Sequence, residues 1–285
     1  MSYIIRSYKI FDKMDINIVV IGAHPDDCEI KAGGTAAAFA RRGHKILFVS
    51  VTNGSAGHYH LGREELSEIR KAESLEAARI LGVEYIVLDN NDGTLLPSID
   101  VREQIIRLIR EWSADIVITH RTNDYHPDHR NTAVIVQDAA YLVMVPHIVP
   151  GTPPLKTNPV FLFLEDRFQK PIPFTPDIVV DITETFELKT KAMAAHKSQF
   201  FDWIPWISGN SSPLPEDYKG RLNWLAEQWK PTMDDLKKKS LAKWYGKDAA
   251  EKVKLAEAFE ICEYGHQPSE SEIKRLFPML GDLIQ

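Results

Sequence analysis

Residues 16–27, which read INIVVIGAHPDD, decide the fold class of this chain. They open with a short run rich in β-branched residues that ends at Gly22, and such a run predicts a buried strand. A helix rich in small residues is predicted at 33–42, where Gly43 stops it. A strand followed so closely by a helix is typical of a βαβ unit.

Strands and helices keep alternating outward from this stretch through the first half of the chain. Further strands are predicted at 45–51, 85–88 and 116–119, and helices at 64–81, 101–112 and 131–145. Short connections between alternating elements predict an α/β fold with a doubly wound, mainly parallel sheet. Sites in such sheets lie beyond the carboxyl ends of the strands, here after residues 21, 51 and 119.

The second half of the chain differs in composition. Eight of the 17 prolines lie in 146–176, which predicts a surface excursion with extended pieces at 160–164 and 178–182 and a helix at 184–199. The last part carries five of the six tryptophans and lysine-rich helical patterns, including a run at 237–239 that is typical of a solvated helix face. We therefore expect a domain at 1–200 and a helical, Trp-rich C-terminal extension at 201–285 packed on it.

The overall composition excludes several classes of protein. Of the 285 residues, 44% are hydrophobic and 26% charged, and the formal net charge of −6 argues against a general nucleic-acid binder. No apolar run approaches the ~20 residues that span a bilayer. Cys28 and Cys262 are too few for a disulfide framework and are expected to be reduced core residues. Residues 1–15 lack a continuous apolar region, so no secretory signal is predicted and the cytoplasm is the expected location.

The motif His24-Pro25-Asp26-Asp27 follows the first predicted strand. His24 and Asp27 are three residues apart, so a single turn places them on the same side, where they can begin a divalent metal site. Asp26 would remain beside them, free to act as a base. An aspartate pair that caps the following helix is the alternative interpretation.

A second motif, His126-Pro127-Asp128-His129, follows the fourth predicted strand. Since both motifs lie at strand ends of the same sheet, they can meet across its edge. One histidine from here would complete a set of two histidines and one carboxylate, and three protein ligands with an open position are typical of catalytic zinc. A lone histidine is more often a satisfied core or surface residue, but two such motifs at equivalent strand ends favour the metal site.

The loop after the second predicted strand, and the absence of several known motifs, narrow the range of possible activities further. Gly54 and Gly57 permit positive φ and close backbone approach to a ligand, although a plain flexible loop is an equal alternative. His58 and His60 in the same loop are predicted to be bystanders. The glycine fingerprint of dinucleotide folds, the P-loop, the G-x-S-x-G elbow and HExxH are absent from the sequence. Cys28, beside two carboxylates, would be a poor nucleophile.

Residues from about 16 to 200 resemble the PIG-L/LmbE-type deacetylases, zinc-dependent enzymes that remove an acyl group from an amino sugar. The motifs that carry the resemblance are Ala23-His24-Pro25-Asp26-Asp27 with Glu29 and Gly34-Thr35; Thr52-Asn53-Gly54; Arg70-Lys71-Ala72-Glu73 with Ala77-Ala78 and Leu81-Gly82; His126-Pro127-Asp128-His129; and His196-Lys197-Ser198-Gln199.

The resemblance implies a Rossmann-like fold and a role for each motif. A zinc ion per chain would be bound by His24, Asp27 and His129. Asp26 would be the general base toward a zinc-activated water, and His126 would face the oxyanion as a cation or a hydrogen-bond donor. Asp128 would orient His126, raise its pKa and so favour the charged form. Three further residues are expected near the substrate, namely Arg70, Asn53 and His196. Lys31 departs from the small residue that relatives often have there, and a helix near 256–259 is expected to match the family's closing segment.

The function implied by the resemblance is removal of an acyl group, in the first place acetyl, from the amide nitrogen of an N-acetylglucosamine-type amino sugar or its conjugate. An amidase acting on a thiol-sugar conjugate or another N-acyl substrate is one alternative. A catalytically inactive sugar- or metal-binding relative, with tryptophans stacked on sugar rings, is another, and iron, cobalt or manganese could replace zinc. The expected partner is a small amino sugar, with no nucleic acid and no membrane insertion, and relatives often form homo-oligomers.

Overall fold

The computed structural model describes residues 15–209 and 213–280. The segment that we predict to lack a secretory signal therefore lies, except for Asp15, outside the described residues. In the described ranges, no helix is both long and apolar enough to cross a membrane. Cys28 and Cys262 are free and buried, as expected from the sequence.

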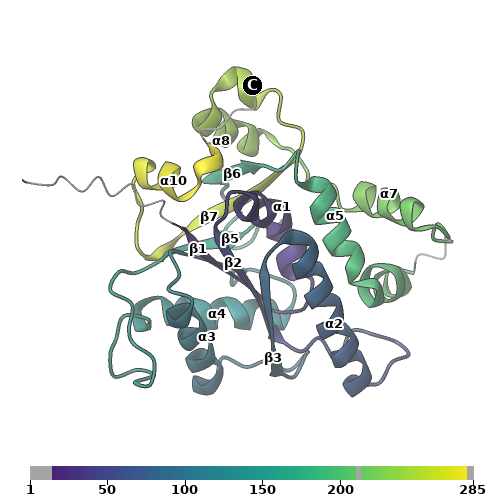
Figure 1. Ribbon diagram of the computed structural model, residues 1–285, viewed down its shortest axis with the longest axis horizontal. Helices are drawn as coiled ribbons and strands as arrows, with labels where there is room; N and C mark the ends of the chain where they lie inside the picture. The colour runs from purple at the N-terminus through teal and green to yellow at the C-terminus, as the bar shows by residue number, and fades with distance from the viewer. Residues whose placement is uncertain (1–14, 210–212, 281–285) are drawn as a thin grey trace, which may run out of the picture.

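A seven-stranded sheet with the order β3-β2-β1-β4-β5-β7-β6 forms the centre of the molecule (Figure 1). The first five strands in this order pair in parallel, whereas β7 runs antiparallel to both β5 and β6. The predicted doubly wound, mainly parallel sheet is thus confirmed. The strands are β1 (Asn17–Gly22), β2 (Lys45–Thr52), β3 (Glu84–Asn90), β4 (Ile116–Thr119), β5 (Val160–Leu164), β6 (Ile178–Asp181) and β7 (Ala256–Gly265).

Helices cover both faces of the sheet because alternate strand residues point to opposite sides and both sets are apolar. Ile18 and Val20 face α1, α2, α5, α8 and α10, while Val19 and Ile21 face α3 and α4 (Figure 1). The helices are α1 (Asp27–Arg41), α2 (Arg63–Leu81), α3 (Ile99–Glu111), α4 (Pro127–Leu142), α5 (Phe186–Ala195), α6 (Ile204–Ile207), α7 (Tyr218–Gln228), α8 (Asp235–Tyr245), α9 (Lys247–Ala250) and α10 (Glu270–Leu276), with a π-helix at Ser198–Trp203 and a 3-10 turn at Pro278–Leu280.

Two helices begin earlier than their apolar periodicity predicts. α1 begins at Asp27 instead of residue 33, and α4 begins at Pro127 instead of residue 131. Both starts are favoured by acidic residues in the first turn of the helix. The start of α4 is also favoured by a proline at its first position. Both histidine–proline–aspartate motifs consequently lie at helix N-termini.

The C-terminal extension is helical only in part. The helix expected near 256–259 is wrong, because this segment belongs to β7, which lies between β5 and β6. Ala256, Ala258 and Phe259 are all buried, and a strand buried on both faces lacks the alternation that distinguishes it from a helix. Glu257 in the same strand accepts hydrogen bonds from the backbone N–H groups of Gly34 and Thr35 in α1, at 3.0 and 2.7 Å.

The tryptophans and lysines of the extension have mixed environments. Trp244 is buried and donates its indole N–H to the carbonyl of Asp177 at 2.7 Å. Trp224 and Trp229 pack, partly buried, against a cluster that includes Phe200. Lys238 and Lys239 are exposed, as predicted for the run 237–239, but Lys237 is not. It is buried and donates to the carbonyl of Thr232, since α8 turns that side toward the core.

Candidate metal centre

Both histidine–proline–aspartate motifs lie at the carboxyl edge of the sheet, where a strand runs into a helix. The first follows β1 and enters α1 through Asp26, whose backbone is left-handed at φ 116° and ψ −28°. The second follows β4 and enters α4 through His126. Because β1 and β4 are paired neighbours, the two motifs meet, as their positions in the sequence predict.

Three side chains converge between the motifs, and Asp27 takes part through both of its carboxylate oxygens. Nδ1 of His24 lies 3.2 Å from Nε2 of His129 and 3.5 Å from Oδ2 of Asp27. Nε2 of His129 lies 3.5 Å from Oδ1 of Asp27. Tetrahedral coordination with bonds of about 2.0–2.1 Å places neighbouring ligand atoms about 3.4 Å apart. Since two facing imidazole lone pairs repel unless a proton or a cation lies between them, this donor set fits a divalent metal.

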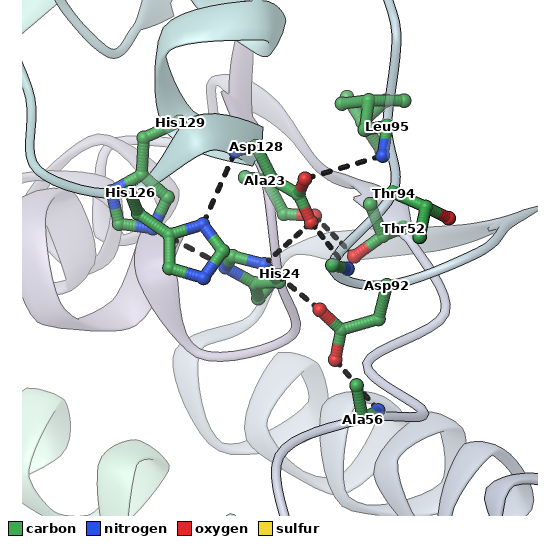
Figure 2. Close-up of polar contacts among 12 residues, drawn as sticks. Ala23, His24, Thr52, Ala56, Asp92, Thr94, Leu95, His126, Asp128 and His129 are labelled. Atoms are coloured by element: carbon green, nitrogen blue, oxygen red, sulfur yellow. Dashed lines mark hydrogen bonds and ion pairs between the residues drawn. The ribbon is translucent and has the colours of Figure 1, made fainter.

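His24 is oriented by two carboxylates on the side of the ring away from this convergence (Figure 2). Its Nε2 lies 3.2 Å from Oδ1 of Asp92 and 3.3 Å from Oδ2 of Asp128. A proton on Nε2 is therefore held by these carboxylates, and Nδ1 is left free to bind a metal. Asp92 also accepts the backbone N–H of Ala56 at 2.8 Å. Burial alone would raise the pKa of Asp92, but its bonds to His24 and Ala56 lower it to about 2.

Asp128 does not orient His126, contrary to expectation. Its fully buried carboxylate turns toward His24 and the loop after β3, where it accepts the backbone N–H groups of Gly93 and Leu95 at 2.7 and 3.2 Å. Nδ1 of His126 instead accepts the backbone N–H of Asp128 at 3.2 Å, which places the ring proton on Nε2 (Figure 2). Burial, His24 and His129 lower the pKa of His126, and Asp128 opposes this lowering. The ring thus presents Nε2–H as a donor, which is one of the two predicted forms, and the imidazolium form stays a prediction.

Asp26 lies beside the converging ligands and is held by Arg70. Nη2 of Arg70 lies 3.0 Å from Oδ2 of Asp26, and it also donates to the carbonyl of Pro25. Burial raises the pKa of Asp26 to about 6, while the Arg70 guanidinium opposes this rise. A carboxylate with a pKa near neutrality is suited to taking up and releasing a proton. The buried Arg70 thus contacts the candidate base instead of presenting an open surface to a substrate.

The two other residues expected near the substrate lie inside the protein. The side chain of Asn53 donates to Oδ1 of Asp89 at 3.1 Å and accepts the backbone N–H of Ser55 at 3.2 Å, so it holds its own loop in shape. His196 is fully buried, with Nε2 3.0 Å from Oε1 of Glu29. Both side chains are buried, and contact of either with a substrate stays a prediction.

Three residues of the centre were not identified from the sequence. Asp92 lies just after β3, at the carboxyl end of a strand, where sites of such sheets are expected. It was not identified because no histidine lies near it in the sequence. His120 directly follows β4, with Nε2 3.2 Å from Oδ2 of Asp27. Oδ1 of Asp124 lies 3.1 Å from Nδ1 of His129. The structure thus groups His24, Asp27, His129, His120, Asp92, Asp128 and His126 in overlapping sets that could hold a metal ion.

Comparison with known proteins shows which family this part of the chain resembles. A family model described as PIG-L, GlcNAc-PI de-N-acetylase, matches residues 19–140, a range that includes both motifs and all three converging ligands. Residues 19–140 of the chain thus resemble the PIG-L family. The chain is 27% identical to the diacetylchitobiose deacetylase of Thermococcus kodakarensis, over 87% of each protein.

Two further relatives widen the comparison. The solved structure of N,N'-diacetylchitobiose deacetylase from Pyrococcus horikoshii superposes with a TM-score of 0.64 at 26% identity, covering 86% of the present chain and 83% of the deacetylase chain. The 4-oxalmesaconate hydratase of Pseudomonas putida is 24% identical over 70% of the chain and 80% of its own length. The proteins that the chain resembles thus include both deacetylases and a hydratase.

Proposed function

We propose that the chain is a metal-dependent amide hydrolase that removes an acyl group, in the first place acetyl, from an N-acetylglucosamine-type amino sugar or its conjugate. The observation that carries the proposal is the convergence of His24, Asp27 and His129 at 3.2–3.5 Å, with Asp26 beside them but paired elsewhere. The deacetylase relatives support the substrate class.

The three converging side chains would hold the ion, which we propose to be zinc. Burial would raise the pKa of Asp27, but His129 and His120 hold it well below its usual range, so the carboxylate is ionised as a ligand must be. A divalent ion held there would lower the pKa of a water molecule toward 7 and would polarise the acyl carbonyl. Asp92 and Asp128 keep His24 in the orientation that this binding needs.

Asp26 and His126 would carry out the proton transfer and the charge stabilisation. Asp26 accepts the proton of the attacking water, and Arg70 limits the rotation of its carboxylate. Nε2–H of His126 donates to the oxygen of the acyl group as negative charge develops there. The proton held on Asp26 is then available to the departing amine.

The first test combines metal content with amine release from N-acetylglucosamine and N,N'-diacetylchitobiose. Wild type and Asp26→Asn are each expected to hold about one zinc ion, whereas Asp26→Asn loses about 10²–10⁴-fold in kcat. His126→Ala is expected to keep the metal and lose about 10²–10³-fold. Asp27→Ala should lose the metal, and His147→Ala, at an exposed histidine, serves as the control.

The hydratase relative defines the contrasting outcome of this test. Water addition to 4-oxalmesaconate without release of any amine would replace the amidase proposal with a hydratase. Hydrolysis confined to thiol-sugar conjugates would keep the reaction and change the substrate. Absence of metal after reconstitution would remove the proposal altogether. Homo-oligomer formation and a cytoplasmic location stay predictions.

A further inference from the structure

We propose that His120 is a positioning residue of the metal centre, which holds Asp27 by a hydrogen bond and His129 by ring stacking. The inference rests on the metal-binding part of the proposed function and does not depend on which amide is hydrolysed. It concerns a histidine that stands alone in the sequence, directly after β4, and whose side chain is only 4% exposed.

The contact with Asp27 determines which carboxylate oxygen stays available. Nε2 of His120 lies 3.2 Å from Oδ2 of Asp27, and the same oxygen accepts the backbone N–H groups of Ala23 and His24 at 2.9 and 2.8 Å. Three donors thus surround Oδ2, while Oδ1 is directed toward His129. Hydrogen bonds of this kind to a ligating carboxylate set its orientation and its basicity.

The contact with His129 determines the plane of that imidazole. The rings of His120 and His129 lie with centroids 4.2 Å apart and planes inclined by only 7°. At the edge of the His129 ring, Nδ1 lies 3.1 Å from Oδ1 of Asp124. The stack and the edge contact together leave the ring one orientation, in which Nε2 faces His24 at 3.2 Å.

A direct ligand role for His120 fits this geometry less well. Nε2 of His120 lies 3.0 Å from the backbone nitrogen of Ala23 and 3.2 Å from Oδ2 of Asp27, so a metal ion on this nitrogen would have to displace both contacts. The backbone N–H of Ala23 also lies 2.9 Å from Oδ2 of Asp27, and an ionised carboxylate is the stronger acceptor. The N–H of Ala23 therefore goes to Asp27, and Nε2–H of His120 donates to the same oxygen.

The two contacts can be removed separately by substitution. His120→Gln keeps an N–H donor at a similar reach and removes the ring, whereas His120→Phe keeps the ring and removes the donor. His120→Ala removes both, and His147→Ala is the control at an exposed histidine. The measurements are the zinc dissociation constant, from competition with a chelator, and the visible spectrum of the cobalt-substituted protein, which reports ligand geometry. Near-ultraviolet circular dichroism checks that each variant is folded.

We expect His120→Ala to weaken zinc binding about 10–100-fold and to alter the cobalt spectrum, with Gln and Phe falling between Ala and wild type. Unchanged zinc affinity and an unchanged cobalt spectrum in all three folded variants would overturn the positioning role while leaving the proposed metal centre intact. Loss of zinc as complete in His120→Gln as in Asp27→Ala would overturn it in favour of a ligand. A wild-type protein that binds no zinc would remove the metal centre itself, and this inference with it.

Discussion

Gly54 shows how closely the loop after β2 is fitted to the first motif. Its backbone is left-handed at φ +67°, and a Cβ built there would lie 2.9 Å from Cδ of Pro25, inside the His24–Asp27 turn. The close approach predicted for this glycine is therefore an approach to the protein's own proline. A side chain at Gly54 would strain the backbone and displace the turn that carries two candidate ligands and the candidate base.

We therefore expect Gly54→Ala to lower the free energy of unfolding by about 1–2 kcal/mol, the cost of a left-handed alanine before any clash is counted. It should also weaken metal binding. Urea denaturation and zinc titration measure the two effects. Gly62→Ala is the matched control, because Gly62 has φ −70° and a Cβ there would meet no atom within 4 Å. If Gly54→Ala and Gly62→Ala changed the unfolding free energy and zinc binding equally, the special role of the left-handed Gly54 would be contradicted.

Residues of the centre could be predicted from the sequence only where a motif marks them. His24, Asp26 and Asp27 are consecutive or nearly so, and a short turn places them together without further information. His120 contacts Asp27 across 93 residues of sequence, so spacing offers no signal for it. The error over Asp128 has a related cause, since spacing along α4 does not determine which way a first-turn side chain points.

The loop 53–62 is joined to the segment 198–207 by a column of four rings. Tyr59 stacks on His58 at 4.9 Å and on Trp206 at 4.8 Å, and Trp206 stacks on Trp203 at 5.2 Å. Tyr59 and Trp206 thus have a ring on each side, which disfavours stacking of a sugar on either of them. The same loop supplies the N–H of Ala56 to Asp92, so the column steadies a contact of the metal centre.

Tyr59 and Trp206 are the exposed members of this column, and removing one of them tests that role. Trp206 is 52% exposed, so Trp206→Ala should change global stability by no more than the loss of two ring pairs, about 1–3 kcal/mol. We expect faster amide hydrogen exchange in residues 56–62 with no change in β1. Tyr141→Ala, at a tyrosine that is 75% exposed on α4, is the control. Unchanged exchange in the loop would return Trp206 to consideration as a ligand-binding ring.

Element types were predictable where periodicity was unambiguous and failed where burial removes it. The strands at 45–51 and 116–119 were predicted to within a residue, because apolar runs bounded by turn signals define them. β7 was missed, since a central strand buried on both faces shows neither the period of a half-buried strand nor that of an amphipathic helix. The early starts of α1 and α4 depend on capping geometry, which apolar periodicity does not report.

At the scale of the whole molecule, the last third of the chain completes the sheet. β7 pairs with β5 on one side and with β6 on the other, so β6 is held in the sheet through β7. The side chains of Glu257 in β7 and Lys189 in α5 are each 3% exposed and form an ion pair at 2.7 Å. Phe259 and Phe277 belong to the same apolar cluster as Ile178 and Val180. We propose that the extension and the first 200 residues form a single cooperative unit.

A chain cut after residue 200 should therefore fail to fold. The cut exposes one edge of β5, removes the neighbour of β6 and leaves Lys189 without Glu257, and an unpaired buried charge alone costs about 3–5 kcal/mol. The total stability of a domain is only about 5–15 kcal/mol, so these losses exceed or exhaust it. We expect residues 1–200 to show no cooperative thermal unfolding by circular dichroism, whereas residues 1–280 unfold cooperatively. Cooperative unfolding of the shorter chain, with the zinc affinity of the longer one, would establish the first 200 residues as an autonomous domain and the extension as an addition to it.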